Sequence, residues 1–326
     1  MGDVRQAAQD EELRESQRAL RARLAQLLDF AVPTSTPALV VLDERRRDGY
    51  REQRVHYASK AGEEIPALLL VPEGDGPFPG VVAHHQHHSQ WHLGKSEVAG
   101  LAGDPDQAFG PVLARRGLAI LAPDAVGFED RRRTRSGTTP DDDDQRQYCN
   151  EMAYRLLSGE LLISAVLADG AQAVSVLGRV QAVDRQRIGL VGHSMGGTTA
   201  LFHAALDERV QFACASGAAA TYRAKLAAGT GIEAALVIPG VSQVADVDDI
   251  AMLIAPRPLL LVSATEDPYS QDATAIAEHA RRTYAGLGAA DALTHVRFSG
   301  GHALTGERVE LLEDWVVAQA HPQASS

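Results

Sequence analysis

The sequence predicts an α/β fold in which a mostly parallel central sheet of about eight strands is flanked by helices. Short apolar runs, among them 80–83, 118–122 and 259–262, alternate along the chain with longer segments of helical pattern. These runs are apolar at almost every position, as expected for strands that are buried on both faces of a sheet. A further run, 188–191, leads through a glycine-rich turn directly into a helix. This order of elements favours a parallel sheet with helices on both faces.

The composition argues against several classes of function. The chain has 326 residues, is 45% hydrophobic and carries a formal net charge of −12. It can therefore bury a sizeable core, but its charge disfavours nucleic acid and anionic membrane surfaces as partners. Cys149 and Cys214 lack C-x-x-C spacing, which argues against a disulfide framework and a zinc knuckle. Because we recognise no secretory signal and no apolar run long enough to span a bilayer, we expect a cytoplasmic protein.

Residues 1–38 are expected to form a helical extension and a linker ahead of the α/β domain, which covers residues 39–326. Leucines at helical spacing within residues 6–30 predict an amphipathic helix, and residues 32–37 (VPTSTP) predict the linker. Such a helix docks either on its own domain or on a second subunit. It is therefore a candidate contact in a homo-oligomer.

The rest of the chain predicts an antiparallel hairpin and then the parallel sheet, with two excursions. Residues 53–58 and 65–71 form the expected hairpin, at the edge of the sheet. The excursions cover about 126–160 and 218–250, and the first contains two charge runs that we expect to lie in a solvated loop, 131–133 and 141–144. The other expected elements are helix 105–116, helical 145–177 with a break near 158–159, strand 211–216, strand 258–263, helix 271–286, strand 293–298 and helix 306–319.

The glycine-rich turn fits the pattern G-x-S-x-G, in the segment Gly192-His193-Ser194-Met195-Gly196. A strand precedes it and a helix follows it, which is the context of a nucleophile elbow. A serine on a strained turn has little room around it, so the positions flanking the turn favour glycine. The helix after the turn directs its N-terminal amides toward the place where an oxyanion would form. The segment therefore predicts Ser194 as a nucleophile.

A serine hydroxyl needs a base to remove its proton and an acid to orient that base. In a fold of this kind both follow the serine, each on a loop after a later strand. The last such loop contains His302 between flexible glycines, so we expect His302 to be the base. The preceding loop contains Glu266 and Asp267, and we favour Asp267 as the acid because Glu266 lies one residue closer to the strand.

A cluster of histidines follows the strand at 80–83 and comprises His84, His85, His87, His88 and His92. A metal site would also need carboxylate or cysteine ligands and partners that orient them, so we expect no metal here. The end of this early strand is where an α/β enzyme supplies one backbone N–H of its oxyanion hole. We expect one donor to be the N–H group of Met195 and the other to be that of Gln86 or, alternatively, His87, with Gln86 favoured. The expected lining of the substrate pocket is His85, His87 and His193.

Several short motifs follow one another in order between residues 65 and 317: Gly94-Lys95-Ser96-Glu97, Leu113-Ala114-Arg115-Arg116-Gly117, Ala122-Pro123-Asp124-Ala125-Val126-Gly127-Phe128-Glu129, Asp184-Arg185-Gln186-Arg187-Ile188-Gly189, the elbow up to Gly197, Ile254-Ala255-Pro256-Arg257-Pro258 and Gly301-His302. In this order they resemble the dienelactone-hydrolase-like branch of the α/β-hydrolases, including its acetyl-xylan-esterase-like members. The resemblance implies an α/β-hydrolase fold, an esterase-type activity through Ser194, Asp267 and His302, and neither a metal nor an organic cofactor.

The chain departs from this branch at two places. His85-Gln86-His87-His88 stands where the branch has a His-Gly loop, which affects the oxyanion hole. The nucleophile is serine rather than the cysteine of dienelactone hydrolase itself, so the lactone substrate of that enzyme does not carry over.

The favoured function is hydrolysis of a small-molecule carboxylic ester or lactone through an acyl-enzyme. Two enzymatic alternatives stay open, a peptidase-like hydrolase and a non-hydrolytic enzyme that performs a cyclisation or elimination in a biosynthetic pathway. A relative that only binds a small molecule is a third alternative. A complete set of serine, histidine and aspartate argues against a pure binder but does not exclude non-hydrolytic chemistry.

Overall fold

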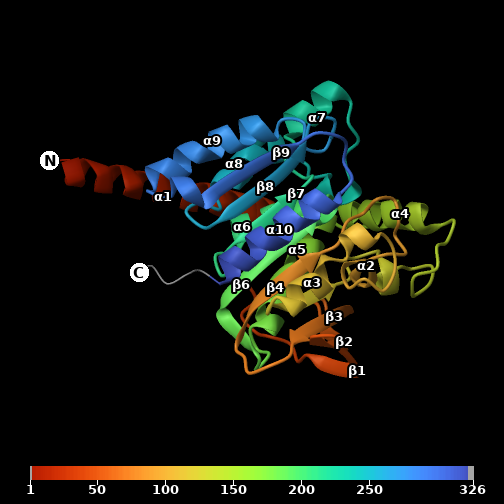
Figure 1. The fold of residues 1–326 in the computed structure, drawn as a ribbon. Helices are drawn as coiled ribbons and strands as arrows, with labels where there is room; N and C mark the ends of the chain where they lie inside the picture. The colour runs from red at the N-terminus through yellow and green to blue at the C-terminus, as the bar shows by residue number, and fades with distance from the viewer. Residues whose placement is uncertain (1, 322–326) are drawn as a thin grey trace.

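The computed structural model describes residues 2–321 and contains one nine-stranded sheet in the order β1-β2-β3-β5-β4-β6-β7-β8-β9 (Figure 1). The strands are β1 (Val40–Arg47), β2 (Tyr50–Ala58), β3 (Glu64–Pro72), β4 (Phe78–His84), β5 (Ala119–Pro123), β6 (Val183–His193), β7 (Ala213–Ser216), β8 (Leu259–Ala264) and β9 (Leu293–Phe298). The α-helices are α1 (Gly2–Leu27), α2 (Lys95–Val98), α3 (Phe109–Arg115), α4 (Asp144–Leu157), α5 (Leu162–Leu177), α6 (Met195–Leu206), α7 (Tyr222–Ala228), α8 (Val247–Met252), α9 (Ala273–Gly286) and α10 (Gly306–Ala320).

Neighbouring strands from β5 to β9 are parallel, and the pairs β1–β2, β2–β3 and β3–β5 are antiparallel. The predicted fold class is therefore confirmed. The expectation that residues 53–58 and 65–71 form the edge of the sheet is wrong, because β1 pairs with β2 outside them. Its apolar residues are exposed, with Val41 at 50% and Leu42 at 60%, so β1 lacks the buried pattern by which a strand is recognised.

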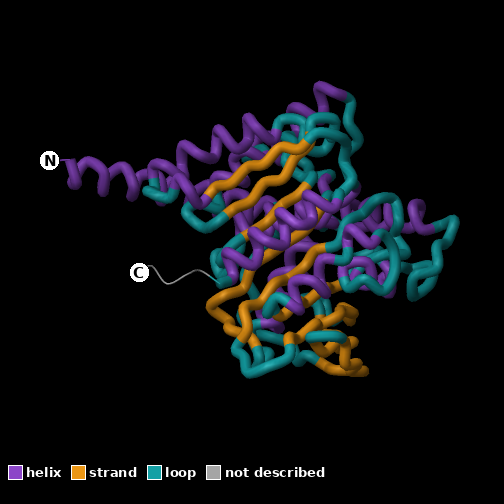
Figure 2. Tube along the Cα trace, in the orientation of Figure 1, coloured by secondary structure: helices purple, strands orange, loops and turns teal. Residues whose placement is uncertain are grey.

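Helices cover both faces of the sheet, and Figure 2 shows the strands crossing between them. Alternate side chains of one strand serve the two layers. In β4, Val81 packs in the cluster that contains residues of α3 and α10, whereas Val82 packs with residues of α5, α6, α8 and α9. Because both faces are covered, the catalytic groups of this fold must be carried by loops at the strand ends.

Helix α1 contacts its own domain through its C-terminal half, while its first turns project away from the sheet (Figure 1). The side-chain amide of Gln17 donates to the carbonyl oxygens of Met252 and Ala255, at 2.9 and 3.0 Å. Leu24 and Leu28 are fully buried in the same contact. The homo-oligomer expected through this helix stays a prediction.

The two charge runs of the first excursion are solvated only in part. Arg133, Asp142 and Asp143 are exposed as expected, whereas Arg132 and Asp144 are buried. Arg132 and Asp144 form an ion pair at 2.5 Å with side chains only 2% and 3% exposed. Arg131 pairs with Asp169 at 2.7 Å and is 7% exposed. Burial is tolerated because each guanidinium meets a carboxylate.

Within residues 2–321, no single helix is long and apolar enough to cross a membrane. Helices α4 and α5 satisfy length and composition only as a pair, and that pair is bent by 98°.

Candidate active site

Ser194 lies between the end of β6 and the start of α6, with φ 56° and ψ −123°. This backbone conformation is rare for a residue with a side chain and costs about 1–3 kcal/mol. The Ser194 N–H donates to the carbonyl of Ser216 on β7, at 2.8 Å, which holds the strained turn against the sheet. The structure thus places Ser194 on a sharp strand-to-helix turn, as the G-x-S-x-G pattern predicts.

Two glycines allow this turn to pack closely. A Cβ atom on Gly192 would lie 2.3 Å from backbone atoms of Gly196. A Cβ atom on Gly196 would lie 2.1 Å from the carbonyl oxygen of His84, at the end of β4. The first turn of α6 can therefore approach the end of β4 only because Gly196 has no side chain. This contact brings the loop after β4 beside Ser194.

His302 and Asp267 come from the loops after β9 and β8 and form a continuous hydrogen-bonded row with Ser194. His302 Nε2 lies 2.8 Å from Ser194 Oγ, and His302 Nδ1 lies 2.9 Å from Asp267 Oδ1. An ionised carboxylate can only accept, so Nδ1 carries the proton and Nε2 is free to accept the serine proton. The row has the geometry of a nucleophile, a base and an orienting acid.

Asp267 is held in place from several sides. It is 2% exposed, and its carboxylate also accepts from the Tyr269 N–H at 2.9 Å and from the Ser270 hydroxyl at 2.6 Å. Burial by itself raises the pKa of Asp267, but the hydrogen bonds that its carboxylate accepts from His302, Ser270 and the Tyr269 N–H act against burial, and the net effect lowers the pKa. The carboxylate therefore stays ionised beside the imidazole. Glu266, by contrast, is exposed.

Two rings flank the His302 imidazole. The Tyr269 ring meets it edge to face at a centroid distance of 4.8 Å, and the His193 ring lies at 4.9 Å, tilted by 32°. His193 is 1% exposed, and its Nδ1 lies 3.0 Å from the Ser216 hydroxyl. Burial and the nearby His302 lower the pKa of His193 to about 3, so the ring is neutral. His193 was expected to line the substrate pocket; the structure corrects this, because the ring lies buried against the base.

The expected oxyanion donors lie on the two elements that Gly196 brings together. Met195 is the first residue of α6, and the first N–H groups of a helix have no acceptor within it. Gln86 lies in the loop after β4 and is 5% exposed. Its carbonyl oxygen accepts from His85 Nδ1 at 2.8 Å, and its side-chain amide donates to Glu97 at 3.1 Å.

His85 is a bridge between loops rather than an open pocket wall, which corrects its expected role. Its Nε2 accepts from the Ala125 N–H at 3.1 Å while its Nδ1 donates to Gln86. Burial lowers the pKa of His85 to about 4, so the ring is neutral. Each of its two nitrogens takes part in one hydrogen bond. It is 3% exposed and borders a small cavity of about 20 Å³.

His87 lies in an aromatic cluster above Met195. Its ring meets Trp91 at 5.1 Å, Phe128 at 5.7 Å and Tyr148 at 5.7 Å. The Tyr148 hydroxyl lies 3.9 Å from the Met195 sulfur and donates to Glu233 at 2.5 Å. Tyr148 belongs to the first excursion and Glu233 to the second, so the two excursions meet beside the elbow. No local pattern had singled out either residue.

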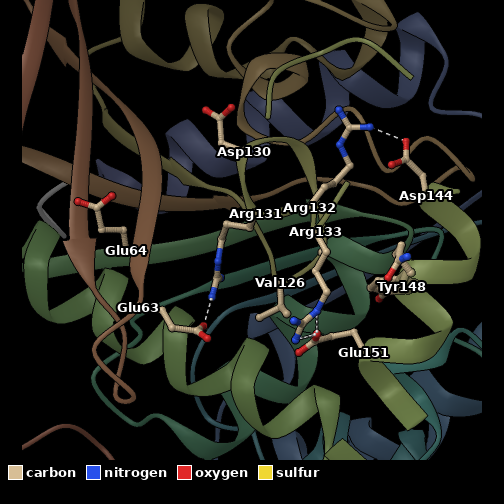
Figure 3. A pocket seen from close by; sticks show the side chains of 12 residues that line it. Glu63, Glu64, Val126, Asp130, Arg131, Arg132, Arg133, Asp144, Tyr148 and Glu151 are labelled. Atoms are coloured by element: carbon tan, nitrogen blue, oxygen red, sulfur yellow. Dashed lines mark hydrogen bonds and ion pairs between the residues drawn. The ribbon is translucent and has the colours of Figure 1, made fainter. Parts of the chain in front are cut away.

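A polar cavity of about 260 Å³ has Tyr148 and Val126 among its lining residues (Figure 3). Three consecutive arginines reach into its walls and pair with different acids. These pairs are Arg131 with Glu63, Arg132 with Asp144 and Arg133 with Glu151. Two further acids, Glu64 and Asp130, also line the cavity, so its walls carry both ion pairs and additional carboxylates.

The histidine cluster does not converge on one point. His84 packs against His203 at 5.9 Å, His85 against Phe128 at 4.8 Å, and His87 against Trp91. In the part of the chain that the structure describes, the group of three side chains close enough together to bind a metal ion consists of Asp124, Glu129 and Asp130. The ammonium of Lys95 lies 2.6–2.7 Å from all three.

Comparison with known proteins identifies the family. The model of the acetyl xylan esterase family (AXE1) matches residues 112–219. The Bacillus subtilis (strain 168) protein described as the hydrolase YtaP is 30% identical over 265 residues, which cover 78% of this chain and 84% of that protein. The chain belongs to the acetyl-xylan-esterase-like serine esterases of the α/β-hydrolase superfamily. It is an ester-hydrolysing enzyme.

Solved structures of esterases share the fold. A Bacteroides fragilis NCTC 9343 protein described as an acetyl xylan esterase has a TM-score of 0.73 at 18% identity, covering 88% of this chain and 76% of its own. A glucuronoyl esterase from Solibacter usitatus has a TM-score of 0.62 at 15% identity, covering 91% and 92%. Acetyl xylan esterase 1 from Thermoanaerobacterium sp. JW/SL YS485 has a TM-score of 0.60 at 16% identity, covering 95% and 98%.

Removal of metal ions should leave this esterase active. The carboxylates that could bind a cation hold Lys95, and the triad geometry needs no metal to activate Ser194. After prolonged dialysis against EDTA, kcat/KM should equal that of untreated enzyme, and metal analysis should find less than one equivalent. Stoichiometric zinc that leaves together with activity would contradict this.

Proposed function

We propose that this esterase removes short acyl groups from hydroxylated, carbohydrate-like alcohols, with Ser194 as nucleophile, His302 as base and Asp267 as orienting acid. The observation that carries the proposal is the row of hydrogen bonds at 2.8 and 2.9 Å through His302. The alcohol class is suggested by the name of the acetyl xylan esterases among its relatives.

The reaction follows from these positions. Ser194 Oγ attacks the ester carbonyl while His302 Nε2 takes its proton, and the Met195 and Gln86 N–H groups receive the developing oxyanion. His302 then gives the proton to the leaving alcohol, which frees it and leaves an acyl-serine. A water molecule that loses its proton to His302 attacks the acyl-serine, and the acid is released as the proton returns to Ser194.

Two features support the substrate class. Met195, Tyr148 and Trp91 are each no more than 8% exposed and pack together beside the elbow, which leaves room for a short acyl chain only. The cavity that Tyr148 lines has walls rich in charged and hydrogen-bonding side chains, and such walls suit an alcohol with several hydroxyl groups.

A fluorophosphonate probe tests the catalytic assignment, because its phosphorus mimics the tetrahedral intermediate. We expect one equivalent of probe on Ser194 of the native protein, seen by intact mass and peptide mapping. His302→Ala should stay unlabelled, since labelling needs the serine, the base and the oxyanion donors together. Labelling at another residue, or equal labelling of folded His302→Ala, would refute the assignment.

A series of p-nitrophenyl esters tests the acyl preference. We expect kcat/KM to be highest for acetate and to fall from butyrate to octanoate, because the packed wall beside Met195 excludes longer chains. Acetylated sugars should then be cleaved in preference to acetates of plain alkyl alcohols. A maximum at octanoate, or no hydrolysis of any ester by folded enzyme that reacts with the probe, would contradict the substrate proposal.

A further inference from the structure

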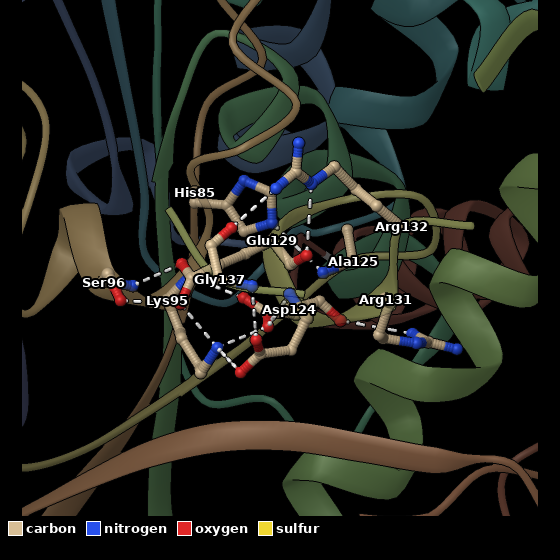
Figure 4. A network of polar contacts seen from close by, with 10 residues as sticks. His85, Lys95, Ser96, Asp124, Ala125, Glu129, Arg131, Arg132 and Gly137 are labelled. Atoms are coloured by element: carbon tan, nitrogen blue, oxygen red, sulfur yellow. Dashed lines mark hydrogen bonds and ion pairs between the residues drawn. The ribbon is translucent and has the colours of Figure 1, made fainter. Parts of the chain in front are cut away.

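A buried charge cluster joins the segment after β4 to the segment after β5, and Figure 4 shows its contacts. The Lys95 ammonium lies 2.6 Å from Asp124 Oδ2, 2.6 Å from Glu129 Oε1 and 2.7 Å from Asp130 Oδ2. The side chains of Lys95, Asp124 and Glu129 are 6%, 0% and 3% exposed. All three hydrogens of the ammonium therefore have carboxylate acceptors, of which Asp124 and Glu129 are buried and Asp130 is 24% exposed.

Such a cluster is costly to bury. Burial lowers the pKa of Lys95, but Asp124 and Glu129 outweigh burial and raise it, so the ammonium stays charged. Burial, and then repulsion from Glu129, raise the pKa of Asp124. Buried ion clusters are often no more stabilising than apolar side chains of similar volume. A gain in stability therefore does not explain why this cluster is buried.

The cluster joins the backbone of the two loops. The Lys95 N–H donates to Asp124 Oδ1 at 2.8 Å, and the Ser96 N–H donates to Glu129 Oε2 at 2.9 Å. The Glu129 N–H in turn donates to the Trp91 carbonyl at 2.8 Å. Glu129 adopts φ 40°, a conformation that the surrounding bonds must hold in place.

The joined segments hold Gln86 from both sides. Glu97, two residues after Lys95, accepts from the Gln86 side chain at 3.1 Å. Ala125, next to Asp124, donates to His85, which donates to the Gln86 carbonyl. Because these contacts end on His85 and Gln86, a shift of either loop would move the two residues between which the Gln86 N–H lies.

We propose that Lys95, through Asp124, Glu129 and Asp130, is a positioning residue that fixes the Gln86 N–H as the second oxyanion donor. The inference rests on the proposed function, in which Gln86 is that donor. Lys95 does not touch substrate. It acts by holding the loop after β4 against the loop after β5.

Lys95→Met keeps the length of the side chain and removes the ammonium. We expect kcat for p-nitrophenyl acetate to fall by about 10²-fold, as on loss of one oxyanion donor, with KM within a factor of three. Lys60→Met is the matched control, because the Lys60 side chain is 66% exposed and pairs only with exposed Asp29. Its kinetics should equal those of the wild type.

A sulfur-substituted substrate separates positioning from general damage. In a thionoester the developing charge is on sulfur, which fits an oxyanion hole poorly, so the wild type should prefer the ester strongly. Lys95→Met should lose most of this preference, measured as the ratio of kcat/KM values. A variant that is merely less folded would lose both activities equally and keep the ratio. An unchanged ratio, or a rise in KM at constant kcat, would overturn the inference.

Gln86→Ala covers the case in which Lys95→Met does not fold. It removes the side-chain amide that bonds to Glu97 but keeps the backbone N–H, and it should reduce the same ratio. Folding is checked by thermal melting and by the fraction of sites that the fluorophosphonate titrates. If wild-type enzyme hydrolyses the ester and both variants keep the ratio, only the positioning inference fails. If wild-type enzyme hydrolyses no ester, the proposed function fails.

Discussion

Replacement of Ser194 by alanine should lower kcat by about 10⁶-fold, the loss typical when the nucleophile of such a triad is removed. The Ser194 hydroxyl makes a hydrogen bond to His302, and alanine removes this single oxygen atom, which is the attacking atom. The strained backbone stays, since glycines around the turn and the Ser216 contact maintain it. Thermal melting should therefore be close to that of the wild type.

The measurement is the steady-state rate of p-nitrophenyl acetate hydrolysis, divided by the concentration of folded enzyme. Ser158→Ala is a matched control, because Ser158 is exposed at the end of α4 and should be replaceable without effect. Retention of more than a tenth of wild-type kcat in folded Ser194→Ala would show that another residue attacks the ester.

Asp267→Asn should lower kcat by about 10⁴-fold. A carboxylate accepts from His302 Nδ1 and stabilises the imidazolium that forms when the serine proton moves. An amide in its place is neutral and can donate to Nδ1, which would leave the proton on Nε2 and block proton removal from Ser194. In that orientation the amide oxygen would still accept from the Ser270 hydroxyl and hold the side chain in place, while the Tyr269 N–H would lose its acceptor.

Glu266→Gln is the comparison that decides between adjacent acids. Glu266 is exposed, and its backbone N–H donates to the carbonyl of Gly300 whatever the side chain. We expect its kcat to stay within a factor of two of the wild type. If Glu266→Gln were the more damaged variant, Glu266 would be the orienting acid.

The parallel half of the sheet could be predicted because its strands are local features. Strands β5, β7 and β8, most of β4 and the second half of β6 are apolar runs buried on both faces, and the turn around Ser194 is encoded by Gly192 and Gly196 close to it in the chain. Strand β1 could not be predicted in the same way. It lies at the edge with its apolar side chains exposed, so burial imposes no pattern on its sequence.

The candidate site divides in the same manner. Ser194, Asp267 and His302 each stand just after a strand, where chain order alone suggests their roles. The pocket roles expected for His85 and His193 were wrong, because whether a side chain faces solvent or a neighbouring loop depends on packing. The pair Tyr148–Glu233 joins residues 85 positions apart and has no local signal.

Short-range pattern was therefore sufficient for the fold class, the elbow and the order of the candidate triad. Strand periodicity, glycine requirements and residue chemistry act over a few neighbouring positions and can be seen in one chain. Lys95 and its acids, by contrast, lie 29 to 35 positions apart and meet only when β4 and β5 pair. Their effect depends on distances of 2.6 to 2.7 Å between side chains, and only the folded backbone brings those atoms together.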